Sequence, residues 1–170
     1  RKKHIIEWTA YAIVLVALYI SFHFIWMIGK IPSESMEPTL MVHDWTIGSR
    51  TIYKDELPKR GDIVIFYSDE EQETMVKRVI GLPGEKITFV GGHVYVNGER
   101  LDESAYLDDS VVTDPGDQDE FVVPDGCIFV LGDNREVSYD ARYWENPYIS
   151  QDKIQSDVEV VIPFHKLPWF

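Results

Sequence analysis

The sequence predicts a mainly β protein with one membrane-spanning helix at its N-terminal end. Three observations predict this fold class. Residues 8–28 contain no Asp, Glu, Lys or Arg. The chain that follows consists of short apolar runs separated by glycine, proline and charged residues, which is typical of strands joined by turns. No amphipathic helical pattern there is longer than a few turns, so we expect antiparallel hairpins behind one apolar helix.

The apolar run Trp8–Ile28 is long enough to cross a bilayer. At 1.5 Å per residue it spans about 31 Å, the thickness of the hydrocarbon core. Trp8 and Trp26 lie near its two ends, where aromatic belts form. A cleaved leader has a shorter apolar region followed by small residues, but Ile25-Trp26-Met27 occupy that place, so we expect an uncleaved anchor. The basic residues Arg1–Lys3 predict a single-pass protein of the cell membrane with a cytoplasmic N-terminus and an extracytoplasmic domain.

The chain is strongly acidic, with a net charge of −13 over 170 residues. This charge argues against nucleic acid as a partner, because binding phosphates requires a basic face. Removing Arg1–Lys3 from the 16 cations and Glu7 from the 29 anions leaves 13 against 28, a net charge of −15 for the outer part. Because that charge repels anionic headgroups, we expect the domain to contact the membrane through apolar groups. The single cysteine, Cys127, excludes an intramolecular disulfide and is expected in a buried strand.

Strand-like runs follow one another along the rest of the chain. The expected strands are residues 45–52, 63–67, 75–80, 87–90, 94–96, 121–123, 127–131 and 157–164. Gly91-Gly92 and Asn97-Gly98 supply the positive φ angles that two-residue turns need, which predicts two hairpins. The acidic stretch 102–120 is expected to be a solvated excursion. A calcium loop is the alternative there, although the Asp-x-Asp-x-Asp-Gly order is missing.

One stretch, Pro32–Leu40, follows directly on the apolar run. Its two prolines favour an extended or tightly turned backbone between them. Alternation along an extended backbone places Ser33 and Ser35 on the same side, which suits a nucleophile with a second hydroxyl beside it. The alternative is a polar linker next to the membrane.

A serine nucleophile needs a base, and the sequence has neither a G-x-S-x-G elbow nor an H-E-x-x-H pair. The five histidines are scattered, so a Ser-His-Asp triad is neither favoured nor excluded. A lysine can act as the base when apolar surroundings lower its pKa from about 10.4 to near 7. Lys77 is the candidate, because alternation places it on one face with Met75 and Val79. The alternative is a solvated lysine at a strand edge.

Four blocks of the sequence together resemble the bacterial type I signal peptidases, which are membrane-anchored Ser/Lys endopeptidases. The blocks are Pro32–Leu40, Arg60–Val64, Lys77–Gly84 and Gly132–Arg142, in that order. The short interval between the last two blocks resembles the compact Gram-positive forms. The resemblance implies an antiparallel β fold of the signal peptidase and repressor-protease type. It places the cytoplasmic tip and anchor at residues 1–29, the catalytic core at 30–85 and 121–170, and a small β insert at 86–120.

Matching positions give the candidate site residues. Ser35 resembles the family's nucleophile and Lys77 its general base. Ser33 matches a position whose hydroxyl contributes to the oxyanion hole in some members. Ser138 resembles the hydroxyl that orients the lysine.

Asp140 and Arg142 resemble a pair that braces the site. The family usually has Asp-Ser-Arg at these positions, whereas this chain has Ala141 in the centre. Because the missing hydroxyl belongs to neither Ser35 nor Lys77, we expect altered support for the site but not a loss of activity.

The resemblance implies cleavage of signal peptides from exported preproteins after small residues of the Ala-x-Ala type, through an acyl-enzyme and without a cofactor or metal. Met36, Leu40, Ile65 and Val76 are candidates to line the shallow substrate pockets. The expected partners are preproteins and the lipid bilayer. Two other functions stay open: a non-catalytic membrane-anchored binding module, and a self-cleaving Ser/Lys protease of the repressor type, against which the anchor and the acidic charge argue.

Overall fold

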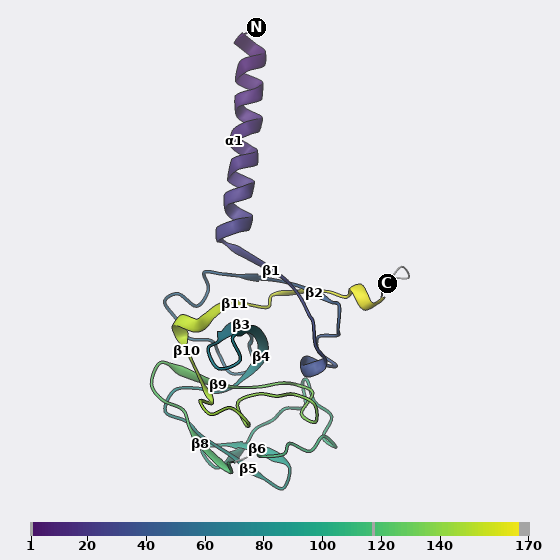
Figure 1. The fold of residues 1–170 in the computed structure, drawn as a ribbon, viewed down its shortest axis with the longest axis vertical. Coiled ribbons are helices and arrows are strands. Elements are labelled where there is room, and N and C mark those ends of the chain that lie inside the picture. Colours follow the sequence, from purple (N-terminus) through teal and green to yellow (C-terminus); the bar gives the residue numbers. More distant parts are fainter. Residues whose placement is uncertain (1, 117, 167–170) are drawn as a thin grey trace.

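The computed structural model describes residues 2–116 and 118–166. A single long helix, α1 (Lys2–Phe24), stands away from a β domain (Figure 1). Its segment Lys3–Phe24 is long and apolar enough to cross a membrane, and its most apolar window is not buried against the rest of the protein. The predicted N-terminal apolar helix is therefore confirmed, and these features are those of a single-pass membrane protein.

The helix ends four residues before the predicted span does. We expected the apolar run to continue to Ile28, but Trp26–Lys30 form strand β1, which pairs antiparallel with β2 (Trp45–Ser49). A continuous apolar run does not by itself distinguish a helix from a strand. Pairing with β2 supplies partners for the β1 backbone, so the chain turns into a sheet as soon as it leaves the helix.

The strands form three antiparallel sheets (Figure 1). The sheet beside α1 has the order β1, β2 and β12 (Val160–Ile162). The central sheet has the order β10 (Tyr148–Ser150), β9 (Cys127–Leu131), β4 (Glu73–Gly81), β3 (Ile63–Ser68) and β11 (Ile154–Asp157). The sheet farthest from the helix has the order β7 (Glu99–Arg100), β6 (His93–Val96), β5 (Lys86–Val90) and β8 (Glu120–Val122). Three single turns of 3-10 helix complete the structure: η1 (Glu34–Met36), η2 (Gln151–Lys153) and η3 (Phe164–Lys166).

The mainly β fold class is confirmed, and most predicted strands are present. The two hairpins β5–β6 and β6–β7 turn at Gly91-Gly92 and Asn97-Gly98, and all four turn residues have positive φ angles. The predicted last strand is instead two strands in different sheets. Between β11 and β12 the chain crosses over, and Glu159 donates its N–H to the carbonyl of Ile47. Strand β10 was not expected, because its short run is surrounded by polar residues.

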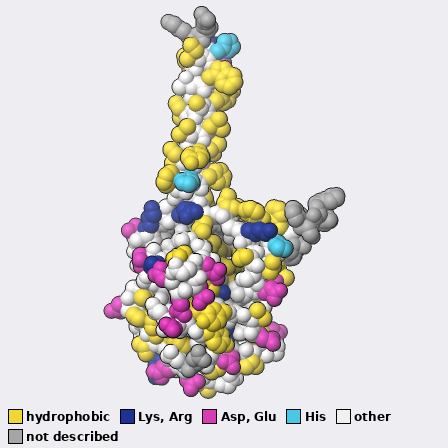
Figure 2. Space-filling model, in the orientation of Figure 1, with side chains coloured by type: hydrophobic (Ala, Val, Ile, Leu, Met, Phe, Trp, Pro, Cys, Tyr) yellow, Lys and Arg dark blue, Asp and Glu magenta, His cyan; other side chains and the backbone are white. Residues whose placement is uncertain are grey.

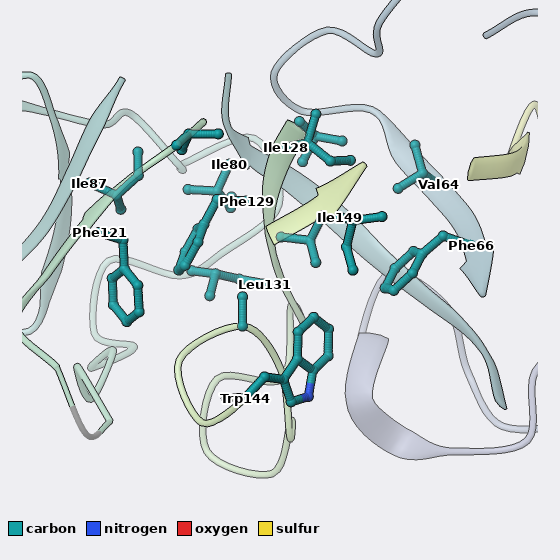
Figure 3. Packing of buried hydrophobic residues seen from close by; sticks show 14 of the residues in the cluster. Val64, Phe66, Ile80, Ile87, Phe121, Ile128, Phe129, Leu131, Trp144 and Ile149 are labelled. Carbon is teal, nitrogen blue, oxygen red and sulfur yellow. The ribbon is translucent and has the colours of Figure 1, made fainter. Parts of the chain in front are cut away.

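The main core fills the space between the central and the far sheet (Figure 3). Phe121 from β8 meets Phe129 from β9 with 4.8 Å between ring centroids. Phe66 from β3 packs edge-on against Trp144. Gly81 of β4 is tightly enclosed, since a Cβ there would lie 2.9 Å from the Cβ of Phe129, its partner on β9, and 3.0 Å from Cδ1 of Ile87 on β5. Cys127 lies in β9, as expected, but is only partly buried.

Candidate active site

The stretch Pro32–Leu40 contains the tight turn η1, which is anchored by apolar residues of the same stretch. Met36 and Leu40 are fully buried and pack with Ile31, and the Leu40 N–H donates to the Met36 carbonyl at 2.9 Å. This anchoring holds Ser35 at the surface of the core with 9% of its area exposed. The hydroxyls of Ser33 and Ser35 lie 3.3 Å apart. The two serines do share a side, although a tight turn rather than an extended strand brings them together.

Lys77 and Ser35 meet although 42 residues separate them in the chain. Lys77 Nζ lies 2.7 Å from Ser35 Oγ, within hydrogen-bond distance. Lys77 belongs to β4, where it is paired with Val64 of β3 in the middle of the central sheet. Only 2% of its area is exposed. Lys77 therefore lies on a sheltered face of β4, as the alternation predicted, and its amine lies beside the Ser35 hydroxyl.

Burial changes the proton affinity of Lys77. Because desolvation disfavours the ammonium form, the pKa of Lys77 falls from 10.5 to about 8. The nearby carboxylates of Asp140 and Glu73 partly oppose this effect and raise the pKa, while Arg142 lowers it. With a pKa of about 8, roughly a tenth of the lysine is neutral at pH 7, compared with about 0.0004 for an ordinary lysine.

Asp140 and Arg142 form a fully buried ion pair behind the dyad. Arg142 Nε donates to Asp140 Oδ1 at 2.8 Å, and a terminal nitrogen donates to Oδ2 at 3.0 Å. The same guanidinium donates to the carbonyls of Arg135 and Ser138, and Asp140 accepts the Gly132 N–H at 2.9 Å. One pair thus ties together both ends of the loop that runs from residue 132 to residue 142.

This loop lies directly over Ser35. The Asn134 N–H donates to the Ser35 carbonyl at 3.1 Å. A Cβ on Gly132 would lie 2.1 Å from Ser138 Oγ and 2.4 Å from the Ser35 carbonyl oxygen, so only glycine fits there. The Ser138 hydroxyl is buried and has no hydrogen-bond partner among the residues that the structure describes. Its predicted role of orienting Lys77 stays a prediction.

Ala141 occupies the position where the resemblance led us to expect a serine. It is fully buried and belongs to the main hydrophobic core, which also contains Trp144. In these apolar surroundings a methyl group needs no hydrogen-bond partner, whereas a hydroxyl would need one.

A groove of about 390 Å³ opens beside the dyad. Its walls are the chain from Met27 to Ser33 and the first half of β4, and Ser35 and Lys77 lie in it. Ile65 and Val76, which we expected near the substrate, line this groove. Met36 and Leu40 do not line it. The structure instead places these two side chains in the small core beneath η1, because their burial anchors the turn.

The acidic stretch 102–120 is mostly exposed, as expected, but a few of its residues also pack against the loop behind the site. Glu103 makes an ion pair with the buried side chain of Arg135, which also donates to Thr113 Oγ1 and to the Gly132 carbonyl. Tyr106 stacks under the guanidinium of Arg78 with 3.9 Å from that group to the ring centroid. The acidic composition concealed these contacts, because their partners lie far away in the sequence.

A second buried ion pair links β4 to the start of the same loop. Arg78 Nε and a terminal nitrogen donate to the two oxygens of Asp133, at 2.8 and 2.6 Å. Asp133 also accepts the hydroxyl of Thr39, so η1, β4 and the loop share one polar network. Within residues 2–116 and 118–166, no group of three or more His, Cys, Asp or Glu side chains is arranged to hold a metal ion.

Comparison with known proteins gives a consistent result. The family model described as "Signal peptidase, peptidase S26" matches residues 3–163. A probable signal peptidase I-2 of Synechocystis is 42% identical over 120 residues, which is 67% of this chain and 53% of that protein. A signal peptidase IB of Staphylococcus aureus is 35% identical over 92% of this chain and 88% of its own length.

A crystal structure of a signal peptidase I from Enterococcus faecalis aligns with 61% of this chain and 97% of its own, at 32% identity and a TM-score of 0.47. The chain spans only about half the length of the Synechocystis relative. The family model nonetheless matches nearly all of this chain. The chain therefore belongs to the signal peptidase family, peptidase S26.

Proposed function

We propose that this protein is a serine endopeptidase that removes signal peptides from exported preproteins, with Ser35 as nucleophile and Lys77 as general base. The observation that carries the proposal is the 2.7 Å separation between a buried lysine nitrogen and a serine hydroxyl. A lysine whose pKa is lowered by burial is a base that can take the proton of a serine near neutral pH.

The proposed reaction has two steps. Neutral Lys77 accepts the hydroxyl proton as Ser35 Oγ bonds to the scissile carbonyl carbon. The C–N bond then breaks, the leaving amine takes the proton from Lys77, and an ester to Ser35 remains. In the second step Lys77 accepts a proton from water, whose oxygen attacks the ester. Ser35 recovers its proton and the signal peptide leaves as a carboxylic acid.

The surroundings of the dyad supply groups for stabilising charge. We propose that the hydroxyl of Ser33, 3.3 Å from Ser35 Oγ, donates to the oxyanion together with the Ser35 N–H. One such donor typically contributes about 3–4 kcal/mol to the barrier reduction. We propose that the buried Ser138 hydroxyl, which has no partner among the described residues, contacts the lysine ammonium while it carries the proton, and that the Asp140–Arg142 pair keeps its loop in place.

The groove suits an extended peptide. Strand β1 is the edge of its sheet, and residues 73–77 of β4 pair with β3 alone, so both walls present strand edges to the groove. A peptide can add between such edges as a further strand, with alternate side chains pointing into the walls. We propose that Ile65 and Val76 help form shallow pockets that admit the small residues of an Ala-x-Ala sequence.

We propose a cytoplasmic N-terminus and an extracytoplasmic domain, with 30–85 and 121–170 as catalytic core and 86–120 as insert. The far sheet, drawn from residues 86–122, supports this division. Ser35 follows only 11 residues after Phe24, which at about 3.3 Å per residue keeps the proposed nucleophile within roughly 36 Å of the helix end.

Cleavage of a preprotein tests the proposal. The full chain in detergent is incubated with a preprotein whose signal peptide ends in Ala-x-Ala, and the new N-terminus is sequenced. We expect cleavage directly after the second alanine and none with Ser35→Ala. Ser104→Ala is the matched control, because Ser104 lies on the surface of the insert with its hydroxyl bonded to Asp102. A wild-type protein that leaves the preprotein intact would favour the non-catalytic binding module instead.

A further inference from the structure

The Lys and Arg side chains of the β domain fall into two groups: those that form ion pairs with carboxylates and those that do not. After α1, seven Lys or Arg side chains form ion pairs with carboxylates: Arg60, Arg78, Lys86, Arg100, Arg135, Arg142 and Lys153. Among the described residues, Lys30, Arg50, Lys54, Lys59 and Lys166 have no such ion pair, and Lys77 contacts Ser35. In a domain with twice as many anions as cations, unpaired cations need a separate explanation.

Arg50 is held at the end of the membrane helix. Its backbone N–H donates to the carbonyl of Ile25 at 2.7 Å, and its Nε donates to the carbonyl of Trp26 at 3.1 Å. Those two residues follow directly on Phe24, the last residue of α1. The helix rises about 33 Å over its 23 residues, which matches the hydrocarbon core. The guanidinium of Arg50 is therefore at the depth of the lipid headgroups.

Arg50 and Lys54 line one groove of about 550 Å³ together with Ser49 and Tyr53, whose hydroxyls are engaged by Thr51 and Asp62. One carboxylate, Asp152, also lines this groove, and it is engaged by the Ser150 hydroxyl at 2.6 Å. The groove thus has two cations against one anion, the reverse of the balance in the domain as a whole. Asp55 and Glu56, which follow Lys54, do not line it.

The surface view shows the same division. Figure 2 shows Lys and Arg side chains gathered where the helix joins the domain, while Asp and Glu are spread over the remainder of the visible face. Exposed apolar side chains of the sheet beside the helix, including Ile28 on β1 and Trp45 on β2, share this region of the molecule. Cations and apolar groups together are the composition of a surface that rests on an anionic membrane.

We infer that the groove of Arg50 and Lys54 binds the phosphate headgroup of an anionic lipid in the leaflet beside the domain. Arginine suits this ligand, because its fork of N–H groups matches two phosphate oxygens, and lysine adds a second charge. A free phosphate offers the same chemistry, but the position of Arg50 at the helix end favours the lipid.

The inference does not depend on the proposed peptidase activity, only on the helix lying in a bilayer. It revises the expectation that the domain contacts the membrane through apolar groups alone. The net charge of −15 describes the whole domain, whereas a headgroup within a Debye length of about 8–10 Å interacts mainly with the nearest charges.

Native mass spectrometry of the full chain tests the inference. The protein is released from micelles that contain equal amounts of phosphatidylglycerol and phosphatidylcholine with identical acyl chains, and the bound lipids are counted. We expect phosphatidylglycerol to be retained in preference. The preference should fall at least five-fold in Arg50→Gln/Lys54→Gln, since one cation near an anionic surface contributes about 1 kcal/mol, or a factor of about five.

The matched control is Lys86→Gln/Arg100→Gln, which removes the same two charges from β5 and β7, in the sheet farthest from the helix (Figure 1). This variant should keep the preference of the wild type. Equal loss in both variants, or no preference in the wild type, would overturn the inference. Displacement of phosphatidylglycerol by millimolar inorganic phosphate would show that the groove is a site for free phosphate and would overturn it as well. Thermal unfolding verifies that each variant is folded.

Discussion

Replacing Lys77 by methionine is expected to abolish preprotein cleavage while keeping the protein folded. Methionine has nearly the same length and fits the apolar surroundings of β4, but it has no nitrogen to accept the Ser35 proton. We expect kcat/KM to fall by about 10³-fold or more, because general-base catalysis and activation of the nucleophile are lost together. The initial rate of preprotein cleavage by the full chain in detergent measures this loss.

The same variant should be more stable than the wild type at neutral pH. The folded-state pKa of Lys77 is lowered from 10.5 to about 8, so below pH 8 the folded protein keeps a charged amine buried at a cost. This cost is relieved as the pH rises from 8 to 10.5, because the unfolded chain then binds more protons than the folded one. Lys77→Met removes the cost and should raise the unfolding free energy at pH 7 by about 3 kcal/mol. A variant that is inactive but also less stable would show that Lys77 supports the fold and not the chemistry.

Replacing Arg142 by leucine is expected to give the largest loss of stability. Arg142 and Asp140 are both fully buried, so the change leaves an unpaired carboxylate in the core and frees the carbonyls of Arg135 and Ser138. Breaking a buried ion pair from one side typically costs about 3–5 kcal/mol. Thermal unfolding followed by tryptophan fluorescence measures the change. Any remaining activity should require a higher pH, because Arg142 lowers the pKa of Lys77 and Asp140 raises it.

A surface pair of the same type is the control for this prediction. Arg100→Leu breaks the ion pair with the exposed Asp109 and should cost less than about 1 kcal/mol. The double variant Asp140→Leu/Arg142→Leu should regain part of the stability that Arg142→Leu loses, because it leaves no buried charge. Equal, small losses in Arg142→Leu and Arg100→Leu would mean that the buried pair does not brace the loop.

Two local patterns made Ser35 and Lys77 candidates from the sequence, and the family resemblance singled out Ser35 as the proposed nucleophile and Lys77 as the proposed base. Prolines around Ser35 predicted a held turn, and alternation in β4 placed Lys77 on a sheltered face. Their separation of 2.7 Å could not be predicted from spacing, since it depends on how η1 docks on the central sheet through Met36 and Leu40. That docking role is also why those two residues are absent from the groove that we expected them to line.

Errors in the sequence-based account arise where distant segments decide the structure. The run that ends at Ile28 is apolar throughout, and only its pairing with β2 makes its last residues a strand. The stretch 102–120 is acidic, and only the positions of Arg78 and Arg135 turn Tyr106 and Glu103 into packing residues. Net charge likewise cannot show that the unpaired Arg50 lies beside the helix end.

The pH dependence of kcat/KM tests the central claim, that a buried neutral lysine activates Ser35. This ratio reports the free enzyme, and a substrate without titratable side chains near the cleavage site keeps other groups from contributing. The account predicts a rate that rises about ten-fold per pH unit and levels off near pH 8, the pKa of Lys77. A rise that continues to about pH 10.5, as for a solvated lysine, or that ends near 6.5, as for a histidine base, would contradict it.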